Sequence, residues 1–174
     1  MRRTAWVWLW AFAVAGPAAC ASDPEIGGIY QTTVHTLNTM GCEEGPPDGD
    51  NPYFQIKKQD LLGHIVYGFG TCTSADPGSC TDLGLFSIAF TLPGENGWTG
   101  ATASASSDGS QMCSLGYSES SATLQAGGGV HVELRTYLQD VMLSPDACTT
   151  DEAERRGTSL PCTRYEKIEG TRVR

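Results

Sequence analysis

The sequence predicts an all-β domain: an antiparallel meander of about eight strands, forming a barrel or a sandwich, with one short helix near the C-terminus. Short segments alternate apolar and polar residues, as strands with one buried face do. Clusters of Gly, Pro, Asn, Asp and Ser separate these segments, and the chain contains 21 glycines. No helix-length segment alternates with the strands, so a parallel sheet is not expected.

The first half of the chain contains four expected strands, bounded by turn residues. They span residues 29–40, 53–59, 64–72 and 83–92. In the last of them Phe86, Ile88 and Phe90 alternate with small residues, so these three apolar side chains should share one face. The segment 42–52 is rich in Pro, Gly and Asp and is expected to be a loop.

The second half contains four more expected strands, at 98–106, 112–125, 130–138 and 161–173. The strand 130–138 has two clear faces. One should carry Val130, Val132, Leu134, Thr136 and Leu138, and the other His131, Glu133, Arg135, Tyr137 and Gln139. A short helix over 151–156 is expected to begin at Thr150 or Asp151 as N-cap and to end at Gly157.

The segment Gly28-Ile29-Tyr30 resembles the Gly-x-Trp start of lipocalin-like barrels, with Tyr30 in place of the Trp. This resemblance implies an up-and-down barrel that carries a small apolar ligand. The alternating small residues of 101–106 are compatible with such a cavity, if Ala101 and its neighbours face inward. They could equally make room for Trp98 and Phe90.

Residues 1–19 have the three parts of a secretory signal. Arg2 and Arg3 give a basic start, residues 5–15 are an apolar run, and small residues follow. At about 1.5 Å per residue this run is too short to span a bilayer core of about 30 Å. The sequence therefore predicts export rather than a membrane-spanning helix.

The segment Ala18-Ala19-Cys20 resembles the lipobox of bacterial lipoproteins. This resemblance implies cleavage before Cys20 and fatty acid such as palmitate on its sulfur, so the bilayer is the expected partner of this residue. Pro17 departs from the family pattern, and ordinary signal-peptidase cleavage near Ala19 or Ala21 is the alternative. No Asp comes directly after Cys20. By the resemblance to bacterial lipoproteins, this implies the outer membrane of the cell envelope. The expected organisation is a signal at 1–19, a lipidated tether at 20–28 and one disulfide-stabilised domain at 29–174.

Seven cysteines are an odd number for an exported protein. If Cys20 carries lipid, six remain for three disulfides in an oxidising compartment. Local spacing favours the pairs Cys72–Cys80 and Cys148–Cys162, and elimination leaves Cys42–Cys113. No two cysteines have the close spacing of a zinc site, so no metal is expected, and even pairing leaves no catalytic thiol.

The charge balance limits the partners of the domain. The chain has 11 basic and 20 acidic residues, a net charge of −9, which becomes −11 when Arg2 and Arg3 leave with the signal. Such a surface repels phosphate backbones, so nucleic acid is not an expected partner. Membrane attachment must then be covalent or hydrophobic rather than electrostatic.

Candidate chemical groups are few. The histidines are His35, His64 and His131, and no nucleophile motif accompanies them. His131 is expected on a solvated charged face, and His64 is expected to be exposed. The loop 42–51 gathers four carboxylates, but it lacks the EF-hand pattern, so an ordinary acidic turn is expected rather than a calcium site.

These observations predict a non-enzymatic envelope lipoprotein, without cofactor or catalytic residues, that binds or structurally contacts other envelope proteins. A lipocalin-like carrier of a small apolar ligand is the alternative, and a hydrolase is the third hypothesis. A carrier requires an enclosed apolar cavity. A hydrolase requires a cleft in which titratable groups converge.

Overall fold

The structure is a computed structural model that describes residues 23–81, 88–107, 109 and 111–173. Within these residues nine strands form one antiparallel sheet, which confirms the predicted meander and favours the barrel over the sandwich. The strands are β1 (Gly28–Asn38), β2 (Tyr53–Leu61), β3 (His64–Cys72), β4 (Ile88–Phe90), β5 (Leu92–Pro93), β6 (Gly97–Ser107), β7 (Met112–Gln125), β8 (Gly129–Met142) and β9 (Cys162–Arg172). One α-helix, α1 (Thr150–Arg156), and 3-10 turns at Pro77–Ser79, Pro145–Ala147 and Gly157–Ser159 complete the described elements.

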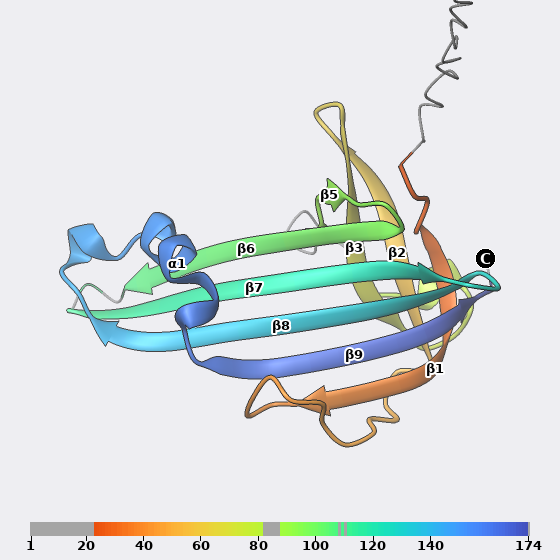
Figure 1. The fold of residues 1–174 in the computed structure, drawn as a ribbon, viewed down its shortest axis with the longest axis horizontal. Coiled ribbons are helices and arrows are strands. Elements are labelled where there is room, and N and C mark those ends of the chain that lie inside the picture. Colours follow the sequence, from red (N-terminus) through yellow and green to blue (C-terminus); the bar gives the residue numbers. More distant parts are fainter. Residues whose placement is uncertain (1–22, 82–87, 108, 110, 174) are drawn as a thin grey trace, which may run out of the picture.

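The sheet curls until its two ends meet, so the barrel is nearly closed (Figure 1). Its strand order is β4-β3-β2-β1-β9-β8-β7-β6-β5, and β4 at the first edge lies against β6 and β7 near the last edge. At the seam, the Thr91 amide donates to the carbonyl oxygen of Thr99 at 2.8 Å, and the Ser120 hydroxyl donates to that of Ala89. Gly100 permits this approach, because a Cβ there would collide with the Ala89 carbonyl.

The expected strands agree closely with the observed ones, with one exception. The predicted strand 83–92 is interrupted at Thr91, where the chain turns from β4 into β5 and the seam begins. Its first residues, 83–87 with Phe86, lie outside the described residues. The eight predicted strands therefore become nine. The single strand expected over 83–92 divides into β4 and β5, which lie at opposite ends of the strand order.

Helix α1 lies on the outer face of β6 and β7, away from the barrel interior (Figure 1). Its N-cap is Thr149, whose hydroxyl accepts from the Glu152 amide at 3.2 Å, so the expected N-cap at Thr150 or Asp151 was one or two residues late. The helix ends at Gly157 as predicted, with a φ of 48° that favours glycine. Ala153 is fully buried against the sheet.

Two separate clusters of buried side chains lie on opposite faces of the same long strands. The barrel cluster consists of Ile26, Tyr30, Phe54, Ile56, Tyr67, Phe90, Trp98, Ala122, Val130, Val132 and Ile168. The helix cluster consists of Cys113, Leu115, Tyr137, Ala153 and Leu160. Along β8 the alternation of faces is as predicted, yet Val132 is fully buried while Leu138 on the same face is half exposed. The covered face therefore changes along the strand, because the barrel closes over one end and α1 covers the other.

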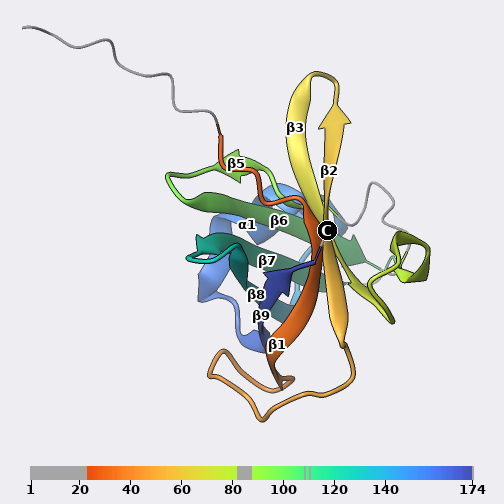
Figure 2. The ribbon, with the colours of Figure 1, turned by 90° about the vertical axis from the view of Figure 1, so that its right-hand side faces the viewer.

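The β2–β3 hairpin projects from the barrel, nearly across the direction of β6–β9 (Figure 2). The described chain begins at Asp23 on the side to which the hairpin tip points, as Figures 1 and 2 both show. This arrangement brings the N-terminal segment, the hairpin and β5 to one end of the domain.

Candidate functional site

The N-terminal segment 24–27 is held firmly against the barrel, although the sequence predicted a polar tether over 20–28. Ile26 is fully buried in the barrel cluster. The indole Nε1 of Trp98 donates to the Pro24 carbonyl oxygen at 2.7 Å, and the Tyr30 hydroxyl donates to the Ile26 carbonyl oxygen at 2.7 Å. Few residues therefore separate Cys20, which lies outside the described residues, from the rigid part of the domain.

Glu25 joins this segment to the β2–β3 hairpin. Its carboxylate accepts from Lys58 Nζ at 2.7 Å, from the Tyr67 hydroxyl at 3.0 Å and from the Gly27 amide at 2.9 Å. Burial alone would raise the pKa of Glu25, but these hydrogen bonds together lower it below its usual value of 4.5. Burial and the neighbouring Glu25 carboxylate raise the pKa of Tyr67, which keeps its phenol protonated as a donor.

We expect Glu25→Gln to remove a pH-dependent part of the stability. The lowered pKa in the folded state means that Glu25 stabilises above its usual pKa, and that this contribution is lost as pH falls through the folded-state value. Because the side chain is half exposed, the loss at pH 7 should stay below about 1 kcal/mol. Urea unfolding at pH 7 and at pH 2.5 measures it. Glu95→Gln, in an exposed turn, is the matched control. If Glu25→Gln lowered the free energy of unfolding equally at both pH values, the assigned role of the Glu25 carboxylate would be contradicted.

A groove of about 610 Å³ runs beside this junction, between the N-terminal segment, the outer face of β2 and the Pro77–Ser79 turn. Its lining residues are Glu25, Gly27, Gly28, Ile29, Gln55, Ile56, Lys57, Lys58, Pro77, Gly78, Cys80 and Thr81. The lining combines the charged side chains of Glu25, Lys57 and Lys58 with glycine backbone and with apolar groups such as Ile29 and Pro77. The groove is open to solvent, in contrast to the closed cavity of a carrier.

His35 is buried in a cluster that the sequence did not reveal. Its Nε2 lies 3.0 Å from Glu166 Oε1 on β9, and its Nδ1 lies 3.7 Å from Asp48 Oδ2 in the loop after β1. Arg164 donates to the other oxygen of Glu166 at 2.7 Å. Both described neighbours of the His35 ring are carboxylates, so this cluster lacks the serine partner of a nucleophilic triad. No local signal could reveal it, because 131 residues separate His35 from Glu166.

His131 lies on the outer face of β8 in the charged stripe that the sequence predicted. Its Nδ1 is 3.0 Å from Glu169 and its Nε2 is 3.4 Å from Glu133. Glu133 also accepts from Arg135 at 2.8 Å and from the Tyr165 hydroxyl at 2.9 Å. Burial alone would raise the pKa of Glu133, but these contacts together lower it below its usual value. Burial and the neighbouring Glu133 carboxylate raise the pKa of Tyr165 to about 12.

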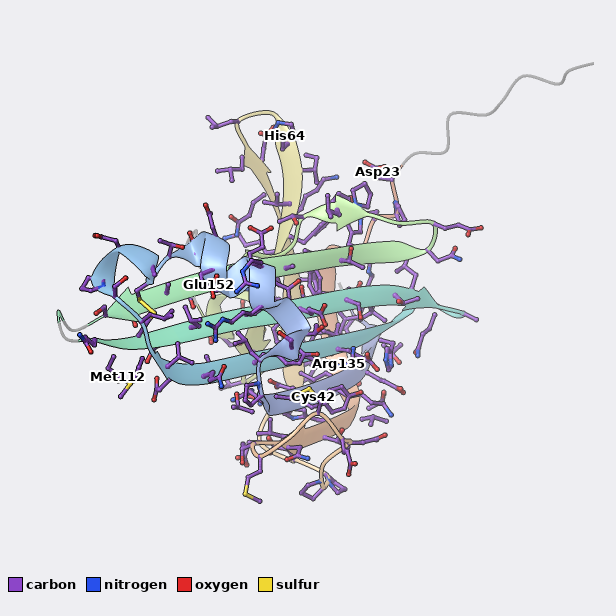
Figure 3. All side chains as sticks on the ribbon, turned by 60° about the vertical axis from the view of Figure 1, so that its left-hand side comes forward. Asp23, Cys42, His64, Met112, Arg135 and Glu152 are labelled. Carbon is purple, nitrogen blue, oxygen red and sulfur yellow. A yellow bond between two sulfur atoms is a disulfide. The ribbon has the colours of Figure 1, made fainter. Side chains whose placement is uncertain are left out.

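The other titratable candidates do not converge. His64 is exposed beside the hairpin tip, as expected (Figure 3). In the acidic loop, Glu44 pairs with Lys167 at 3.0 Å, whereas Asp48 faces His35. In the part of the chain that the structure describes, no three His, Cys, Asp or Glu side chains are placed to hold a metal ion.

All six cysteines that follow Cys20 form disulfides, and the structure corrects two of the expected pairs. Cys72 pairs with Cys80 as predicted. The other bonds are Cys42–Cys162 and Cys113–Cys148, in place of Cys148–Cys162 and Cys42–Cys113. The antiparallel register of β1 and β9 brings the first of these pairs together, because Asn38 lies opposite Tyr165. The docking of α1 on β6 and β7 brings Cys148 to Cys113 at the start of β7.

Ala103 and Ala105, two of the small residues of 101–106, do not line the barrel interior. Ala103 and Ala105 lie on the outer face of β6, where they pack against the helix cluster beneath α1. The barrel interior is instead filled by large side chains, of which Tyr30, Phe54 and Phe90 are fully buried. The alternative in which these alanines face inward and leave room for a ligand gains no support from Ala103 and Ala105, because the sheet buries its outer face at this end.

No helix within the described ranges is long and apolar enough to cross a membrane. Comparison with protein-family models, with curated proteins and with solved structures gives no match for this chain.

Proposed function

We propose that this protein is a lipoprotein of the bacterial cell envelope, exported by residues 1–19 and anchored through lipid on Cys20. Its β domain then acts as a non-enzymatic binding or structural module at the membrane surface. The pairing of cysteines carries this proposal. Six cysteines form three disulfides within the domain, which implies an oxidising compartment and leaves Cys20 as the residue available for lipid.

The structure of the N-terminal junction supports an anchor at this position. Residues 24–27 are docked, so a lipid on Cys20 would hold the whole domain close to the bilayer. Each buried methylene group contributes about 0.8 kcal/mol, so two or three acyl chains give lasting attachment without help from the acidic surface. The groove beside the junction offers a binding surface at the same end of the domain.

The carrier hypothesis gains no support from the barrel, because its interior is filled by aromatic and aliphatic side chains. The hydrolase hypothesis gains none from His35 and His131, whose neighbours are carboxylates. A binding or structural role requires neither a cavity nor a nucleophile.

We expect Cys20→Ser to move nearly all of the protein from the membrane to the soluble fraction, or to stop processing of the leader. The reason is that serine offers no sulfur for the lipid, and the acidic domain has no charge-based attraction to anionic lipid. Cell fractionation and mass spectrometry of the N-terminal peptide make the measurement.

Ser22→Ala is the matched control, because it leaves the Cys20 sulfur in place and should remain membrane-bound. A lipidated peptide that begins at Cys20 supports the proposal. An unmodified Cys20 thiol, an intact leader in the wild type, or a start after Ala21 would overturn it. Counting free thiols in the denatured domain gives an independent result. Six reactive thiols without reductant would show that the three disulfides are absent and would refute folding in an oxidising compartment.

A further inference from the structure

The tip of the β2–β3 hairpin carries an apolar side chain where glycine or asparagine is usual. Leu61 lies opposite His64, so Leu62 and Gly63 form a two-residue turn. Their φ values are 55° and 87°, which place both in the left-handed region of a type I′ turn. Leu62 is nonetheless 95% exposed, and Leu61 is 37% exposed. A leucine in this position has neither a backbone preference nor a packing contact within the domain to explain it.

The hairpin tip lies on the side of the domain from which the chain leads back to Cys20. Figure 3 shows His64 at the tip and Asp23 on the same side, and Figures 1 and 2 agree. The two exposed residues of β5, Leu92 and Pro93, lie at this end as well (Figure 1). The exposed apolar residues of the hairpin tip and of β5 therefore lie at the same end of the domain as the start of the described chain.

The length of the chain then sets how far this end can be from the membrane. Three residue steps separate Cys20 from Asp23, and at 3.3–3.6 Å per residue they span at most about 11 Å. The bonds of Trp98 to Pro24 and of Arg172 to the carbonyl oxygens of Glu25 and Gly27 prevent the segment from peeling away to lengthen this spacer. A lipid anchor on Cys20 would thus turn the hairpin end of the domain toward the bilayer.

We propose that Leu61 and Leu62 insert into the boundary between headgroups and acyl chains, as a second contact of the domain with the lipid bilayer. This inference rests on the proposed lipid anchor. Burying one leucine side chain favours the buried state about ten- to a hundredfold. Such a contact is too weak to recruit the acidic domain alone, but it is sufficient to orient a domain that is already anchored.

The nearby start of the described chain distinguishes this tip from another exposed apolar side chain of the domain. Met40 is 90% exposed on the loop that follows β1, at the opposite end of the domain (Figures 1 and 2). That side chain has similar exposure but no neighbouring anchor. The two positions therefore form a matched pair for a test of membrane contact.

The test uses tryptophan fluorescence in the full-length, processed and lipidated protein. After removal of the leader, Trp98 is the only tryptophan, and it is 3% exposed. Leu62→Trp and Met40→Trp each add one reporter. The proteins are reconstituted into vesicles of phosphatidylethanolamine and phosphatidylglycerol, with and without bromine on the acyl chains. We expect bromine to reduce the added emission of Leu62→Trp at least twofold and to leave that of Met40→Trp unchanged.

The possible outcomes distinguish failure of the membrane contact from failure of the proposed anchor. If the lipidated Leu62→Trp protein has the same added emission with and without bromine, the membrane contact is overturned and the anchor is not. Absence of lipid on Cys20 by mass spectrometry would overturn the anchor and the contact together. Sedimentation in detergent tests the alternative that the tip binds a second copy of the chain. A wild-type dimer that Leu62→Asn converts to a monomer would make the tip an interface between copies and would overturn the membrane contact. Leu62→Asn suits the turn and should keep the fold, so loss of folding does not obscure this result.

Discussion

Replacing Cys42 and Cys162 together by serine should lower the free energy of unfolding by about 5 kcal/mol, the largest effect that we expect of any change. The bond closes a loop with a sequence separation of 120 residues. In the chain-entropy model, the stabilisation grows with the logarithm of the loop length, which gives about 5 kcal/mol here. Because small domains have total stabilities of about 5–15 kcal/mol, this change would remove about a third or more of the total.

The matched control is the double substitution of Cys72 and Cys80. That bond closes a loop with a separation of only 8 residues, so the same model gives a loss of about 2.5 kcal/mol. Urea denaturation of both variants, followed by circular dichroism, compares the two losses directly. Equal losses would show that loop entropy does not govern these bonds, and a larger loss for Cys72 and Cys80 would reverse the expected order.

Tyr30→Ala should cost about 3–5 kcal/mol, because it removes a large, fully buried aromatic ring from the barrel cluster. The Tyr30 ring stacks on Phe54 with centroids 5.1 Å apart, and the Arg172 guanidinium lies 5.6 Å from the Tyr30 centroid. Its hydroxyl donates to the Ile26 carbonyl oxygen and accepts from Arg172 Nη2 at 3.1 Å. The residue thus supports the barrel interior and the N-terminal junction together.

Tyr30→Phe separates these two roles. It keeps the ring stack and removes the hydrogen bonds of the hydroxyl, so it should cost about 1 kcal/mol. Amide exchange of Gly27, measured by NMR, should quicken in the Phe variant because the Ile26 carbonyl loses its donor. If the Phe variant were as unstable as the Ala variant, the hydroxyl network rather than ring burial would hold the cluster. If Ala cost less than 1 kcal/mol, the ring would not be part of the core.

Much of the fold could be predicted because strands, turns and caps depend on nearby residues. The bounds of β3 and β7 follow directly from the alternation between turn residues, and Gly157 ends α1 as expected. The break at Thr91 could not be predicted, because it depends on the hydrogen bond to Thr99 across the seam. The disulfide partners of Cys42 and Cys148 likewise depended on register and helix docking, whereas the predicted pairs used local spacing and elimination.

The candidate site was predictable only in part. The signal, the lipobox resemblance and the odd number of cysteines point to Cys20 within the sequence itself. The role of Glu25 and the exposure of Leu62 could not be predicted, because they depend on where the β2–β3 hairpin stands relative to the start of the domain. The His35–Glu166 contact joins β1 to β9, which are distant in the chain.

The sequence by itself determined where most strands begin and end, which side chains share a face, and how many cysteines remain for disulfides. The tertiary structure alone decided which face is buried at each point. On β8, Val132 and Leu138 share a face, but the closing barrel covers only the first. The reason is that side-chain alternation is a local property of extended backbone. Burial depends instead on the curl of the whole sheet and on α1, which approaches the opposite face from elsewhere in the chain.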